Sequence, residues 1–338
     1  MVLSQHNNRS KYYDAWRGLA ILMVIAIHTY NNNTDVSIGL AIRQLFNCAV
    51  PVFFALSGFF LYKKRFDSKD DVASFWRKQI PKVYIPTILW SLPLFFLGIS
   101  NGKPWCYMAL LLLTCGISVY YFVAVIIQFY LLLPIFKRYS LWHRLGGVLL
   151  STIISLAMIA LVTYYNIVLS MHLPLIIYAG SCLLWLIFFV IGCYMSHVSR
   201  NYSLWIPLFV VIVGFIGSYT EGHFLILNYG SGAGIKPSSF IFSIAMCFVM
   251  FSSRLEQIYN IRHIRAFKAL EYIGSLSFAL YLLHMYVKSF ILPKIPLVSE
   301  YWVLRWLIVF MVSVMIVELI KRTVPSRYHS FIGIYDRS

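Results

Sequence analysis

The stretch that decides the fold is residues 146–165, GGVLLSTIISLAMIALVTYY, which holds 20 residues and no charged side chain. Crossing the hydrocarbon core of a bilayer takes roughly 20 apolar residues in a helix, because a backbone in lipid has to satisfy its own hydrogen bonds. Nine further stretches are long and largely apolar: 15–31, 46–63, 81–99, 119–136, 175–196, 203–219, 238–252, 275–292 and 301–321. The sequence therefore predicts an all-α membrane protein with about ten transmembrane helices.

The composition of the whole chain agrees with this prediction. Of its 338 residues, 60% are hydrophobic and 12% are charged. A soluble domain has about 45–50% apolar and about 25% charged residues, so a soluble, disordered or coiled-coil protein is excluded. The longest polar segments are 63–80, 220–237 and 253–274. We expect one membrane domain over residues 1–338, with no appended soluble domain.

The basic residues predict the orientation of the chain. With the N-terminus in the cytoplasm and alternating crossings, 22 of the 28 Lys and Arg residues fall on the cytoplasmic side. The remaining six are Arg43, Lys103, Lys236, Lys288, Lys294 and Arg305. This imbalance follows the positive-inside rule, so both termini are expected in the cytoplasm. The formal charge of +17 is thereby explained without a nucleic-acid partner.

Two histidines lie deep in the predicted spans. His28 comes eleven residues after Arg17, which places it roughly 16 Å further along a helix, and His284 lies roughly 14 Å from the start of its own span at Ser275. Both therefore reach a similar depth near the middle of the bilayer. Ionisable groups at this depth are rare and mark function. The alternative is that each histidine only bonds a neighbouring helix.

Arg17 and His28 also share one helix face. Eleven steps of about 100° end some 20° beyond three full turns, so the two side chains point the same way. A cation at the cytoplasmic mouth and a histidine base below it suit a long anionic ligand inserted from the cytosol. Alternatively, Arg17 extends to the lipid headgroups as a helix-end residue.

The segment between the second and third spans is the most basic part of the chain. It contains Arg77, Lys78 and Lys82, which lead into the third span. Such a cluster can bind phosphates through charge-assisted hydrogen bonds. Anchoring to anionic lipid headgroups is the alternative.

Five segments, taken in order, resemble the acyltransferase-3 family of integral membrane acyltransferases. They are DAWRGLA (14–20) with His28-Thr29, VPVFFALSGFF (50–60), FWRKQIPKVYIP (75–86), YFVAVIIQFYLLLP (121–134) and GSLSFALYLLH (274–284). The resemblance covers about residues 12–330. The third segment departs from the family pattern, since Lys78, Gln79 and Lys82 replace some of the arginines often found there. Lysine does not form the bidentate hydrogen bonds to phosphate that arginine forms.

The resemblance implies transfer of an acetyl group from cytoplasmic acetyl-CoA to a sugar hydroxyl of a surface polysaccharide or its lipid-linked precursor at the bacterial inner membrane. It implies His28 and His284 as the catalytic pair, with His28 as base or transient acyl acceptor and His284 as an auxiliary polar group. Arg17, Arg77, Lys78 and Lys82 would hold acyl-CoA. No bound cofactor or metal is expected; lipid and a second copy of the chain are candidate partners.

Four other residues are assigned lesser roles. Ser57 and Gly58 are expected to allow close helix packing. Glu221 and His223, in a Gly-rich outward segment, are candidate contacts for the acceptor sugar. Two alternatives to acetyl transfer stay open: a different acyl-CoA donor such as succinyl-CoA, and a non-enzymatic polysaccharide exporter. The lack of acids at mid-membrane and of an evident inverted repeat speaks against export.

Overall fold

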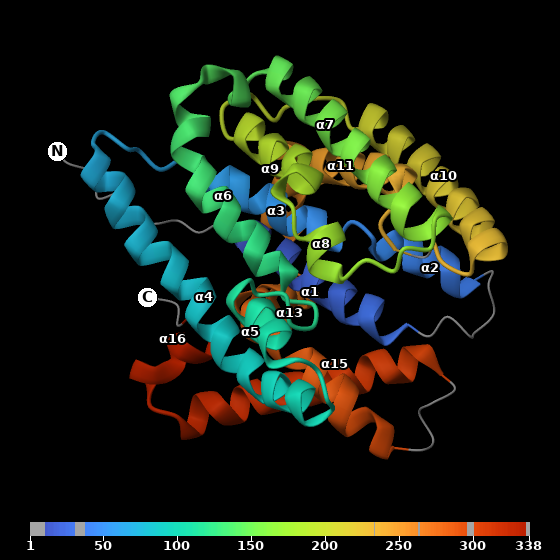
Figure 1. Cartoon of the computed structure of the whole chain (residues 1–338). Coiled ribbons are helices and arrows are strands. Elements are labelled where there is room, and N and C mark those ends of the chain that lie inside the picture. Colours follow the sequence, from blue (N-terminus) through green and yellow to red (C-terminus); the bar gives the residue numbers. More distant parts are fainter. Residues whose placement is uncertain (1–10, 31–37, 233, 263, 296–300, 336–338) are drawn as a thin grey trace.

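The computed structural model describes residues 11–30, 38–232, 234–262, 264–295 and 301–335, which form helices and no strand (Figure 1). The α-helices are α1 (Lys11–Thr29), α2 (Ile38–Phe46), α3 (Ala49–Leu61), α4 (Lys69–Ser100), α5 (Trp105–Leu113), α6 (Tyr121–Arg138), α7 (Leu145–Thr163), α8 (Leu175–Ala179), α9 (Cys182–Met195), α10 (Trp205–Tyr229), α11 (Pro237–Phe251), α12 (Ser253–Arg262), α13 (Arg265–Ser275), α14 (Ser277–Tyr286), α15 (Trp302–Thr323) and α16 (His329–Ile332). Short π-helical turns follow α7 (Tyr164–Val168) and α14 (Val287–Ile291).

The prediction of an all-α membrane protein is confirmed, and the candidate spans can be compared with the ten predicted stretches. Within the described residues, seven helical stretches are long and apolar enough to cross a membrane, or nine if each of two bent helix pairs is one span. The bent pairs are α11 with α12, at 55°, and α13 with α14, at 73°. The tenth predicted stretch corresponds to α1, which is less apolar than the others because it carries Asp14 and Arg17. It packs against protein, with most of its side chains buried, so lipid contact does not dictate its composition.

α1 lies in the middle of the bundle and packs against α3, α13, α14 and α15 (Figure 1). Its closest neighbour is α13. A Cβ atom on Gly18 would lie 2.0 Å from the Leu270 carbonyl oxygen, and one on Gly274 would lie 1.9 Å from the Asp14 carbonyl oxygen. Both glycines thus let the backbones of α1 and α13 touch, as small residues do between membrane helices.

A second glycine pair joins α3 to α9. A Cβ on Gly58 would lie 2.0 Å from the Phe189 carbonyl oxygen, and one on Gly192 would lie 2.0 Å from the Ala55 carbonyl oxygen. This geometry gives Gly58 the packing role that the sequence suggested. The neighbouring Ser57 hydroxyl donates to the Phe53 carbonyl within its own helix, 2.8 Å away.

The outer helices turn apolar side chains away from the protein. On α10, Trp205, Ile206 and Phe209 are 80%, 71% and 67% exposed, and Met311 and Met315 of α15 are also exposed. Exposed apolar surface of this extent is unfavourable in water and is expected for helices that face lipid. Arg17 and His28 lie on α1, inside the bundle.

Candidate active site

The two deep histidines lie side by side. His28 occupies the last turn of α1 and His284 lies in α14, and their ring centroids are 5.3 Å apart, with the ring planes at 37°. This contact agrees with the common depth deduced from the sequence. His284 is fully buried, whereas His28 is partly accessible. Of the two rings, that of His28 is therefore the more accessible.

The hydrogen bonds of His284 define its tautomer. Its Nδ1 lies 2.7 Å from the Tyr281 carbonyl oxygen and 3.2 Å from that of Leu280. A carbonyl oxygen only accepts, so Nδ1 carries the hydrogen and Nε2 keeps a free lone pair. This buried Nε2 has no hydrogen-bond partner among the described residues. Such a lone pair next to His28 can receive a proton or orient the neighbouring ring.

Arg17 lies at the opposite end of α1 from His28. Its Nη1 donates to Asp14 Oδ1 over 2.8 Å, and its guanidinium lies 5.1 Å from the centre of the Phe60 ring. Its side chain is 21% exposed. The ion pair and the ring fix the guanidinium in position while leaving part of it open to a ligand.

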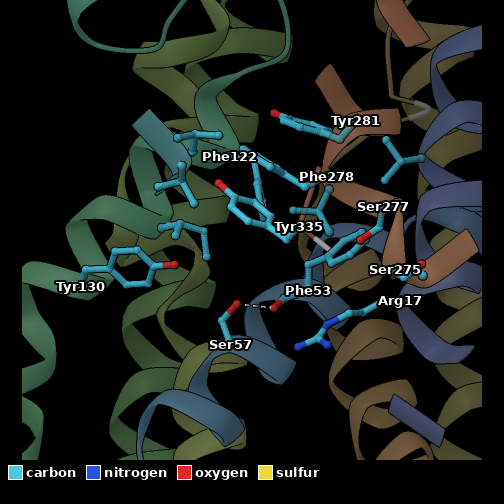
Figure 2. A pocket seen from close by; sticks show the side chains of 16 residues that line it. Arg17, Phe53, Ser57, Phe122, Tyr130, Ser275, Ser277, Phe278, Tyr281 and Tyr335 are labelled. Carbon is cyan, nitrogen blue, oxygen red and sulfur yellow. Dashed lines mark hydrogen bonds between the residues drawn. The ribbon is translucent and has the colours of Figure 1, made fainter. Parts of the chain in front are cut away.

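A cavity of about 290 Å³ begins at Arg17 (Figure 2). Its lining comes from α1, α3, α4, α6, α13, α14 and the C-terminal tail, and consists of Arg17, Val24, Val50, Phe53, Ser57, Val83, Phe122, Val123, Ile126, Tyr130, Gly274, Ser275, Ser277, Phe278, Tyr281 and Tyr335. Most of these side chains are apolar. The cavity thus combines one cation with an apolar lining and a few hydroxyl groups, which is typical of ligand sites.

The cavity follows the predicted face of α1. Val24 lies seven residues, or roughly 10 Å, beyond Arg17, and His28 is one further turn along. His28 is not part of the lining. At the far end, Tyr281 belongs to the lining and its ring centroid is 6.0 Å from that of His284. The cavity therefore ends one helical turn before His28 on α1, and the Tyr281 ring lies between it and His284.

The other candidate acyl-CoA residues do not reach the cavity. Arg77, Lys78 and Lys82 lie on α4 with exposed side chains, and none of them lines it. Lys78 and Lys82 are close enough to Lys64 that their charges, after burial, help to lower the pKa of the Lys64 ammonium. The carbonyl of Lys82 accepts a hydrogen bond from the Tyr335 hydroxyl. These cations form a basic surface outside the cavity rather than part of its wall.

The predicted position of Glu221 and His223 is wrong. They do not lie in a loop, because α10 continues to Tyr229. The Glu221 carboxylate accepts hydrogen bonds from the backbone N–H and the hydroxyl of Ser238, at the start of α11. The His223 ring stacks on that of Tyr219, one turn earlier in the same helix. Glu221 thus ties α10 to α11, and this bond compensates for its polarity within the helix.

Two tyrosines of the cavity wall are not among the site residues predicted from the sequence. Tyr281 precedes His284 by three residues, so it shares a helix face with it, and this spacing was an available signal. Tyr335 comes from the C-terminal tail, where its ring stacks near Phe278 and enters the cavity (Figure 2). Nothing in the local sequence indicates this contact.

These features define a helical membrane protein with two adjacent histidines beyond a cavity that Arg17 lines. The chain belongs to the acyltransferase-3 family: the family model, described as an acyltransferase domain, matches residues 10–321. It is therefore an acyltransferase. No curated protein and no solved structure matches the chain.

Replacing His284 by alanine is expected to slow acyl transfer by about 10- to 100-fold, because the His28 ring loses the neighbour that orients it. His284→Gln, which restores a polar side chain, is expected to recover part of the rate. The measurement is the rate at saturating acyl donor, with protein yield as the control. Equal rates for wild type and His284→Ala would contradict this role.

Proposed function

We propose that the protein transfers an acetyl group from cytoplasmic acetyl-CoA to a sugar hydroxyl of a surface polysaccharide or its lipid-linked precursor. It would do so in the bacterial inner membrane, with both termini in the cytoplasm. The observation that carries the proposal is the course of the cavity along α1, from Arg17 to within one turn of His28.

The donor enters from the side of Arg17. Phosphate groups of CoA bind Arg17 and the basic surface of Arg77, Lys78 and Lys82, where charge-assisted hydrogen bonds form. The pantetheine arm is long, thin and only weakly polar, which suits the apolar wall of the cavity. Its thioester then lies at the end near His28.

His28 acts as the base. Its free imidazole nitrogen removes the proton of the acceptor hydroxyl while that oxygen attacks the thioester carbonyl carbon. The C–S bond breaks, and the proton passes from His28 to the departing CoA thiolate. His284 positions the His28 ring. In an alternative mechanism, the acetyl group is first transferred to His28, which becomes an acyl-histidine, and then to the acceptor hydroxyl. The net reaction is the same.

The test uses purified protein in nanodiscs with acetyl-CoA labelled in the acetyl group. The expected result is His28-dependent transfer of label to acceptor, or slow thioester hydrolysis when no acceptor is present. Surface glycans of a deletion strain should lose O-acetyl groups. If label is transferred only from succinyl-CoA, the donor is succinyl-CoA and not acetyl-CoA. Transport of substrate across vesicle membranes without thioester cleavage would favour an exporter.

Arg17→Ala is expected to raise the apparent KM for acetyl-CoA about tenfold, with a smaller effect on kcat, because a charged hydrogen bond to phosphate is lost. The measurement is the dependence of the initial rate on acetyl-CoA concentration. Arg138→Ala, which removes a cation at the end of α6 outside the cavity, serves as control. An unchanged KM in Arg17→Ala would remove Arg17 from the donor site.

A further inference from the structure

Four basic side chains lie around the His28 end of α1, far from Arg17, and none of them is in an ion pair within the described residues. They are Arg43 of α2, Lys236 just before α11, Lys288 in the turn Val287–Ile291 and Arg305 of α15. The ion pairs of the described residues involve Arg17, Arg200 and Lys321 instead. Among the residues that the structure describes, no carboxylate forms an ion pair with these four basic groups.

Arg43 and Lys236 are joined by a chain of amide side chains. Lys236, which is fully buried, donates to the side-chain oxygen of Gln44. Asn47 donates to the same oxygen over 2.7 Å and accepts a hydrogen bond from Arg43. Gly222 makes room for this arrangement, since a Cβ there would lie 3.3 Å from the lysine ammonium nitrogen. The two basic groups are thus held at fixed positions by neutral partners.

The charges of this cluster act on the catalytic end of α1. Arg43 and Lys288 both lie close enough to His28 to interact with it electrostatically, and Lys288 interacts in the same way with Arg305. The hydroxyl groups of three tyrosines also interact with Arg43: Tyr30, Tyr121 and Tyr178. Arginine with surrounding hydroxyl groups is a common arrangement for carboxylates and phosphates.

Arg305 faces the same region from α15. The indole N–H groups of Trp302 and Trp306, three residues before it and one after it, donate to the Ala26 and Leu22 carbonyls of α1 over 3.1 and 3.0 Å. This places Arg305 on the stripe of α15 that packs on α1. Its Nε is buried and has no hydrogen-bond partner among the described residues.

Within the described ranges, one carboxylate acts on the cluster, and it already accepts hydrogen bonds. Glu221 interacts with Lys236, but its oxygen accepts hydrogen bonds from Ser238. Burial, with a contribution from Arg43, lowers the pKa of Lys236, which precedes the spanning helix α11, to about 7. An anion placed beside Lys236 would favour its charged form. A buried cation without a counter-charge is costly, and an anionic ligand would supply the counter-charge that the described residues do not.

We propose that Arg43, Lys236, Lys288 and Arg305 form a binding site for an anionic group, a carboxylate or a phosphate, carried by the acyl acceptor. The proposal rests on the proposed acyl transfer at His28. It separates the two substrates: acyl-CoA approaches along α1 from Arg17, and the acceptor binds at the opposite end, with its hydroxyl next to His28. The acceptor class is then an acidic sugar, or a sugar linked to lipid through phosphate.

The test measures binding without requiring turnover. Purified full-length protein at low salt is heated with glucose, glucuronate or glucose 1-phosphate, and the unfolding midpoint is recorded. At least one anionic probe is expected to raise the midpoint by about 2–4 °C over the effect of glucose. A carboxylate-only response indicates an acidic sugar, and a phosphate response indicates a phosphate-linked one.

Variants assign the effect to the cluster. Arg43→Gln is expected to abolish the shift by the anionic probe, whereas Lys103→Gln, which removes an exposed lysine from the same predicted side, keeps it. Lys288→Gln repeats the test if Arg43→Gln does not fold. A shift no larger than that of glucose, or one that persists in Arg43→Gln and Lys288→Gln, overturns the proposal. If the anion binds as expected but no His28-dependent acyl transfer is detected, the proposed function is overturned and the anion site is not.

Discussion

Replacing His28 by alanine is expected to reduce acyl transfer at least about 100-fold, the lower limit of what a positioned general base contributes. The same loss is expected for an acyl-histidine course, since either needs the imidazole. His28→Asn, which keeps a polar side chain but no base, is expected to be as inactive. The measurement is transfer of labelled acetyl groups by purified protein, normalised to folded protein.

The control for this experiment is a histidine outside the site. His172 is exposed in the segment before α8, and its backbone has a positive φ that asparagine tolerates, so His172→Asn is expected to retain full activity. His28 should be replaceable without loss of membrane insertion, because the helix is held by the contacts of its other residues. Full activity of purified His28→Ala would exclude His28 as the base.

Substituting Gly18 by alanine is expected to impair both stability and activity. The added Cβ would lie 2.0 Å from the Leu270 carbonyl oxygen, where real contacts stay above 3.0 Å, and the obstructing atom is backbone that cannot rotate away. We expect a loss of about 1–3 kcal/mol in stability. Activity should fall at least about tenfold, since α1 carries both Arg17 and His28. Gly274→Ala should have the same effect from the other side of the contact.

The matched control is Gly217→Ala in α10, where the nearest atom to an added Cβ is 3.7 Å away. Alanine favours helix over glycine, so this variant is expected to be neutral or slightly more stable. The measurements are the unfolding midpoint of the solubilised protein and its acetyl-transfer rate. A wild-type midpoint for Gly18→Ala would show that α1 and α13 can separate at no cost.

Much of the fold could be predicted because membrane insertion is a local property of sequence. Nine of the ten predicted apolar stretches fall in the candidate spans, when each bent pair is one span, and α1 is the exception because it carries Asp14 and Arg17. The shared face of Arg17 and His28 was equally predictable, since it depends only on the helical repeat. The end of α10 was not, because the polar run at Glu221 resembles a loop until its bond to Ser238 is known.

The sequence by itself predicted the membrane class, the family and a common depth for the two histidines. Hydropathy sets the position of a residue along the membrane normal but not which helices become neighbours. Only the tertiary structure therefore decided that His28 meets His284 and that Tyr335 enters the cavity while Arg77 stays outside it. It also decided that Arg43, Lys236, Lys288 and Arg305 gather around one end of α1. These contacts join segments far apart in the chain, and no local pattern encodes them.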